Sequence, residues 1–135
     1  MLESPYKKPF VIPPHEHPRL MLRRADIPKI KESLENPEFS EAKDVFEELC
    51  LRPVTGRGAT PEYGSYDLAE VLTAEALAFR ALLSSEKADA EKAVGTLMLL
   101  LDSFVITGGN MGARWGGHLI FTASQVYDWC YSFLS

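Results

Sequence analysis

The sequence predicts an all-α protein built from antiparallel helical hairpins. Apolar residues recur three and four positions apart in five segments of the chain. No segment has the regular alternation of apolar and polar residues that is typical of a half-exposed strand. Short turns separate some of the periodic segments, which favours antiparallel neighbours. The 135 residues are enough for one domain with a real core.

The chain divides into an extended N-terminal arm, residues 1–22, and a helical domain, residues 23–135. The arm contains five prolines, which donate no backbone hydrogen bond and restrict the residue before them, so a helix is excluded there. Its apolar residues include Phe10, Val11 and Ile12. We therefore expect the arm to lie against the helical body.

Four helices are expected before residue 105. The first covers about 24–34, and the second begins at Asn36-Pro37-Glu38, where Asn can cap and Pro suits the first turn. Pro53 ends the second helix, and glycines and prolines make 54–65 a loop. The third helix is expected over 67–83 and the fourth over 86–104.

The last part of the chain is expected to hold a long glycine-rich connection, 107–117, and then a fifth helix from about His118 to the end. One face of that helix contains Ile120, Ala123, Tyr127, Cys130, Tyr131 and Leu134. Apolar side chains also occur on its other sides, which predicts burial on more than one side. The expected result is a homo-oligomer, in its simplest form a symmetric dimer, unless the arm covers this helix.

Charge and composition narrow the possible functions. The net charge is −5 and no basic stripe is present, which argues against a nucleic-acid partner. An acidic substrate would need a local cationic pocket. The sequence shows no secretory signal and no apolar run long enough to span a membrane, so we expect no membrane partner and a cytoplasmic location. Cys50 and Cys130 lie in apolar helical patterns and are expected to be buried thiols.

Two segments resemble the heparinase II/III-like polysaccharide lyase family. The first is His17-Pro18-Arg19-Leu20-Met21-Leu22, followed by Asp26-Ile27 and Lys29-Ile30-Lys31. The second is Ala123-Ser124-Gln125-Val126-Tyr127-Asp128-Trp129-Cys130-Tyr131, which is similar to an inner helix of the family's α/α toroid. The order and spacing of the two segments agree with that family. The resemblance implies that the chain is the N-terminal part of a toroid.

The resemblance also implies a reaction, β-elimination on polysaccharides that contain uronic acids. A base removes the proton next to the carboxylate, and an acid protonates the leaving oxygen. In the family the catalytic Tyr and His residues lie further along the toroid and in a following β-sandwich domain. We therefore expect no catalytic residue in this chain, and no cofactor. The alternative is a non-catalytic helical module that binds a carbohydrate or a protein.

Arg114, Trp115 and His118 are the predicted substrate-binding residues, and the expected ligand is an acidic polysaccharide or oligosaccharide. Trp can stack on a sugar ring, and Arg can pair with a carboxylate through two hydrogen bonds. A histidine at a helix start can donate to a sugar hydroxyl. The alternatives are a Trp that folds onto the core and a His that caps the helix or lies on the surface.

Other candidates are weaker. His15 and His17 could bind a metal from one side of the arm, but no third ligand is close in sequence, so we predict no metal site. Asp128 fits either a structural hydrogen bond to a neighbouring helix end or a place in the toroid cleft. Tyr63 and Tyr66 could reach a cleft. The glycines at 108–112 lack the strand and the Lys of a phosphate-binding loop.

Overall fold

The computed structural model describes residues 15–55, 67–104 and 109–134, and every regular element in these ranges is a helix. The all-α prediction is therefore confirmed for the described residues. The α-helices are α1 Ile27–Leu34, α2 Ser40–Leu51, α3 Leu68–Ser84, α4 Lys87–Ser103 and α5 Asn110–Cys130. Short 3-10 turns precede α1 and α2 and follow α5: η1 Arg24–Asp26, η2 Pro37–Phe39 and η3 Tyr131–Phe133.

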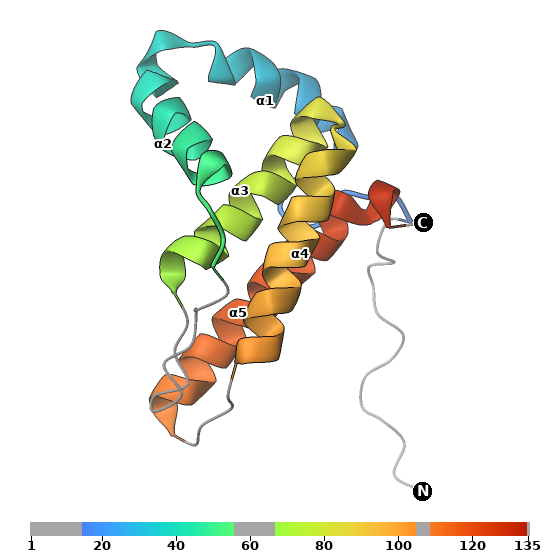
Figure 1. Ribbon diagram of the computed structural model, residues 1–135. Coiled ribbons are helices and arrows are strands. Elements are labelled where there is room, and N and C mark those ends of the chain that lie inside the picture. The colour runs from blue at the N-terminus through green and yellow to red at the C-terminus, as the bar shows by residue number, and fades with distance from the viewer. Residues whose placement is uncertain (1–14, 56–66, 105–108, 135) are drawn as a thin grey trace, which may run out of the picture.

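Helix α3 lies at the centre of the molecule and packs against α2, α4 and α5 (Figure 1). Helices α3 and α4 lie side by side and are joined by Ser85 and Glu86 alone. Ser85 adopts a left-handed conformation with φ 65°, and its N–H donates to the Ala81 carbonyl at 2.8 Å. This ends α3 within one residue and lets the chain turn at once into α4.

Two of the predicted helix starts are confirmed, and a side chain caps each of them. The Asn36 side-chain oxygen accepts the Glu38 backbone N–H at 3.0 Å at the start of η2. The Asp67 carboxylate accepts the Ala69 N–H at 2.8 Å and caps α3. Each cap satisfies a backbone donor that has no partner within its own helix.

The core is built on small residues that let the helices approach closely. Helices α3 and α4 bury a set of alanines: Ala74, Ala76, Ala78, Ala81, Ala90 and Ala93. Leu77 and Leu100 fill the space between them and are completely buried. Burial of each leucine contributes about 1.5–3 kcal/mol. Outside this core, Arg80 of α3 binds Asp89 of α4 through two hydrogen bonds, at 2.8 and 2.6 Å, and Glu47 of α2 at 3.2 Å.

The predicted glycine-rich connection is wrong for residues 110–117, because α5 begins eight residues before His118. Packing explains the difference. Gly112 is buried, and a Cβ added at Gly116 would lie 3.8 Å from the Phe104 ring. This part of α5 therefore packs against the rest of the molecule, and that tertiary contact outweighs the low helix propensity of glycine.

The apolar face that the sequence indicated for α5 is only partly buried, through Cys130 and Ala123. Ile120, Tyr127 and Tyr131 are exposed, whereas Leu119, Val126 and Trp129 face the core. Apolar residues lie on both sides of this helix, so periodicity alone did not identify the buried side. The buried side also contains polar residues, and hydrogen bonds to other elements satisfy some of them: Thr122 and Asp128.

The described part of the arm, residues 15–22, lies against the C-terminal half of α5 and is held there by side-chain contacts. The His17–Pro18 peptide bond is cis. Phe10, Val11, Ile12, Tyr63 and Tyr66 lie outside the described residues. No helix in the described ranges is both long enough and apolar enough to cross a membrane.

Candidate functional site

Asp128 joins the arm to α5 and is the centre of the candidate site. Its side chain is only 2% exposed. One carboxylate oxygen accepts the backbone N–H groups of Arg19 and Leu20, each at 2.8 Å. The other lies 2.5 Å from Nδ1 of His17. Asp128 therefore makes structural hydrogen bonds, as one of the two interpretations predicted, but its partner is the arm and not a helix end. It also lines the pocket described below.

Aromatic and sulfur contacts extend this junction. The His17 ring stacks on Tyr131, with 3.9 Å between the ring centroids, and meets the edge of Tyr127 at 6.1 Å. The amide of Gln125 lies 3.1 Å from the Met21 sulfur. Since a carboxylate offers only acceptors, Nδ1 of His17 is the donor in its hydrogen bond to Asp128.

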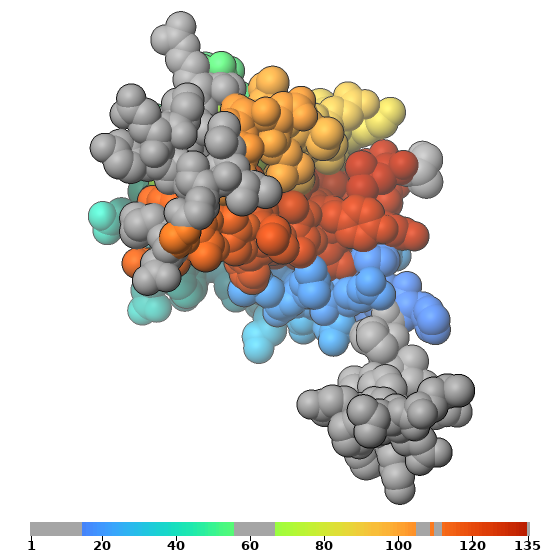
Figure 2. Space-filling model, turned by 90° about the horizontal axis from the view of Figure 1, so that it is seen from below, coloured from blue at the N-terminus to red at the C-terminus, as the bar shows by residue number. Residues whose placement is uncertain are grey.

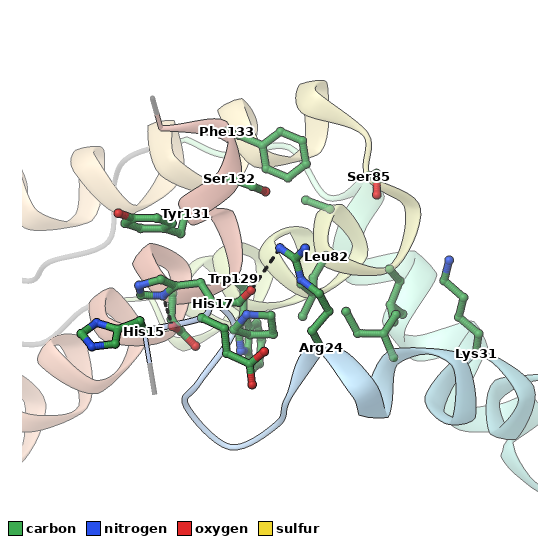
Figure 3. A pocket seen from close by; sticks show the side chains of 16 residues that line it. His15, His17, Arg24, Lys31, Leu82, Ser85, Trp129, Tyr131, Ser132 and Phe133 are labelled. Carbon is green, nitrogen blue, oxygen red and sulfur yellow. Dashed lines mark hydrogen bonds and ion pairs between the residues drawn. The ribbon is translucent and has the colours of Figure 1, made fainter. Parts of the chain in front are cut away.

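A pocket of about 680 Å³ opens beside the junction, between the arm, α1, the end of α3 and the end of α5 (Figure 3). Its wall combines cationic, imidazole and aromatic side chains: Arg24, Lys31, His15, His17, Trp129, Tyr131 and Phe133. The guanidinium of Arg24 donates to the His17 carbonyl at 3.4 Å. Ile27, Leu82 and Leu83 add apolar surface.

The pocket is lined by both cationic and acidic side chains. Arg24 of η1 and Lys31 of α1 are seven residues apart, which corresponds to about 10 Å along a helix. Asp128 of α5 also lines the pocket, but three donors already bind its carboxylate. Glu16 is the other acidic side chain of the wall. The arrangement can hold an anionic group near Arg24 and Lys31 and a flat apolar surface against the aromatic rings.

The predicted substrate-binding residues lie elsewhere, on the N-terminal half of α5. Arg114 is exposed, and Trp115 is half-buried and packs against the core. Nε2 of His118 lies 3.9 Å from a carboxylate oxygen of Glu75 on α3. Arg114 and His118, four residues apart, share one side of the helix, and Trp115 points about 100° away from Arg114. None of the three residues lines the pocket beside Asp128.

Glu75 is a polar residue of this region that the sequence interpretation missed. The Thr122 hydroxyl donates to its carboxylate at 2.5 Å, so Glu75, Thr122 and His118 form one cluster between α3 and α5. The available signal was its position between Ala74 and Ala76, in a helix that is otherwise mostly apolar. A half-buried carboxylate in that position needs polar partners on another element.

The cysteines are buried free thiols, as predicted. Burial raises the pKa of the Cys50 thiol and of the Cys130 thiol to about 11. Neither thiol is therefore a ready nucleophile. Among the described residues, no group of three or more His, Cys, Asp or Glu side chains is arranged to hold a metal ion.

Compared with known proteins, the chain matches no family model and no curated sequence. The resemblance to heparinase II/III-like lyases stays a prediction that depends on residues 17–31 and 123–131.

Proposed function

We propose that this chain is an N-terminal α/α-toroid segment of a heparinase II/III-like polysaccharide lyase. The reaction of the whole enzyme would be β-elimination on polysaccharides that contain uronic acids. The catalytic acid and base would lie in parts of the enzyme outside this chain. Under this proposal the chain supplies helical scaffold and contacts to the sugar.

The Asp128 junction is the observation that supports this proposal. The two segments that carry the resemblance are about 110 residues apart, and they meet through Asp128, His17 and the backbone of Arg19 and Leu20. Such a contact is expected if the two segments belong to one structural unit.

The transcript beyond codon 135 tests the proposal. We expect the reading frame to continue into further helical repeats and then a β-rich domain that contains Tyr and His residues. A stop codon directly after Ser135 in the natural transcript would contradict it.

The second candidate function is a non-catalytic carbohydrate-binding module, and the pocket beside Asp128 favours it. Arg24 and Lys31 offer cations to a sugar carboxylate, and Tyr131 and Phe133 offer rings for stacking. Trp129, which lines the same pocket, provides a fluorescence signal for binding.

Titration with uronate oligosaccharides distinguishes the two candidate contact regions. An Arg24→Ala, Lys31→Ala variant removes the cations of the pocket, and an Arg114→Ala, His118→Ala variant removes the predicted α5 contacts. If the pocket binds the sugar, the affinity for the oligosaccharide falls at least tenfold in the Arg24→Ala, Lys31→Ala variant. It is unchanged in the Arg114→Ala, His118→Ala variant. The opposite pattern would support the sites predicted from the sequence, and equal affinity in all three proteins would exclude both regions.

A further inference from the structure

The outward side of α5, continued by Tyr131 of η3, carries a seam of uncharged residues with the spacing of a coiled coil. Its members lie alternately four and three residues apart and are all exposed: Ala113, Gly117, Ile120, Ser124, Tyr127 and Tyr131. Both tyrosines also contact the His17 ring and remain exposed beside it. Ile120 is 69% exposed and Tyr127 52% exposed. This spacing keeps one side of a helix in contact with a second helix that crosses it at about 20°.

The seam differs in charge from the surface of the other helices. Arg114 is the one charged side chain that α5 exposes among those described, whereas α2 exposes Glu41, Asp44 and Glu48. In Figure 2, α5 forms an orange-to-red band between α4 and the segment that runs from the arm into α1. A long uncharged side of a helix at the surface is typical of a contact with another protein segment.

We propose that two copies of this chain pair through this seam, with their α5 helices antiparallel. In that orientation the seam is complementary to itself in size. Ala113 faces the partner's Tyr131, Gly117 faces the partner's Tyr127, and Ile120 faces the partner's Ser124. Each small residue of one copy receives a large residue of the other, as close packing requires. A two-fold axis near residue 122 generates all of these pairs, as in a symmetric dimer.

A parallel pair would not pack in this way, because Gly117 would face glycine and Tyr127 would face tyrosine. Charge also favours the antiparallel orientation. The same register places Arg114 beside the C-terminal end of the partner's α5, where the helix dipole is negative. The inference uses only α5 and Tyr131 of η3, and it draws no argument from the proposed lyase family.

Oxidative cross-linking of the full chain tests both the contact and its direction. A Cβ added at Gly117 meets nothing within 4 Å, so Gly117→Cys is tolerated in the monomer. In the antiparallel dimer two copies of residue 117 lie ten residues apart, about 15 Å along the helix. That exceeds the ~7 Å that a disulfide spans between Cα atoms. Two copies of Tyr127→Cys are separated by the same distance and are also too far apart to cross-link. Position 117 of one copy, in contrast, faces position 127 of the other.

We expect that neither Gly117→Cys alone nor Tyr127→Cys alone forms a cross-linked dimer. A mixture of the two variants should form one. The native Cys50 and Cys130 are buried and do not compete. Self-linking of Gly117→Cys would show a parallel pair and overturn the proposed orientation.

Light scattering at micromolar concentration gives the second readout. We expect a mass twice the 15.1 kDa of one chain. Ile120→Glu places a charge in the seam and should return the mass to that of one chain, whereas Met98→Glu, at an exposed position on α4, should leave the dimer intact. A monomeric wild-type chain would overturn the proposal. The seam would then be expected to bind a different helix, such as one of a longer chain.

Discussion

Asp128 is the residue on which the arm depends. Its carboxylate is buried and accepts hydrogen bonds from His17, Arg19 and Leu20. An anionic acceptor matters here because hydrogen bonds to charged groups are stronger than those between neutral groups. The buried carboxylate in the C-terminal half of α5 is therefore explained by its contacts with the arm.

Asp128→Asn should lower the free energy of unfolding by about 2–3 kcal/mol, since an amide offers one acceptor oxygen in place of two and its NH2 group faces donors. Urea denaturation measures this change. Asp102→Asn, at an exposed position on α4, is the matched control and should change the stability by less than about 0.5 kcal/mol. Equal stability of the two variants would contradict the role given to Asp128.

The two cysteines make stability depend on alkaline pH. Their pKa rises from 9.0 to about 11 in the folded protein because they are buried. Between pH 9 and 11 the unfolded chain loses the thiol protons and the folded chain keeps them. The folded state then binds more protons, so the free energy of unfolding falls as the pH rises through this window.

Denaturation at pH 8 and pH 10 checks this dependence. We expect the loss of stability between these pH values to be smaller in a Cys50→Ala, Cys130→Ala variant than in the wild type. Other groups titrate in both proteins, so the difference between the two isolates the thiols. The same loss in both proteins would show that the thiols do not contribute.

At the scale of elements, the sequence predicted each helix and most helix starts. The caps at Asn36 and Asp67 are local signals, so they can be interpreted without knowledge of the fold. The start of α5 could not be predicted in this way, because Gly112 and Gly116 belong to a helix only through contacts with distant parts of the chain.

The candidate site was less predictable than the fold. The motif around His17 and the motif around Asp128 were both recognised, but nothing local indicates that they touch. The pocket likewise combines α1, α3 and α5, which are far apart in the sequence. The contact between Glu75 and His118 joins two residues 43 positions apart in the sequence and was missed for the same reason.

Gly95 gives an element-scale prediction with a clear sign. It is exposed in the interior of α4, and a Cβ added there meets nothing within 4 Å. Gly95→Ala should therefore stabilise the protein by about 0.5–1 kcal/mol, because alanine loses less backbone freedom on folding. Urea denaturation checks this prediction: the midpoint of unfolding should rise while the dependence of the free energy of unfolding on urea concentration is unchanged. A lower midpoint would indicate an unrecognised contact at this position.

At the scale of the whole molecule, the described part of the chain has a well-packed core around α3 and two surface features without an assigned ligand. One is the pocket beside Asp128, which is lined by cationic side chains and by aromatic rings. The other is the uncharged seam of α5. Under the lyase proposal, this chain serves as scaffold and contacts the sugar. The catalytic residues lie outside it.

The most direct test of that proposal is the formation of unsaturated uronate, measured by ultraviolet absorbance over a series of acidic polysaccharides. Two samples are compared, the isolated 135-residue chain and the natural gene product that contains it. We predict no turnover by the isolated chain and clear turnover by the natural product on at least one of the polysaccharides. Turnover by the isolated chain, or none by the natural product on any of them, would contradict the account.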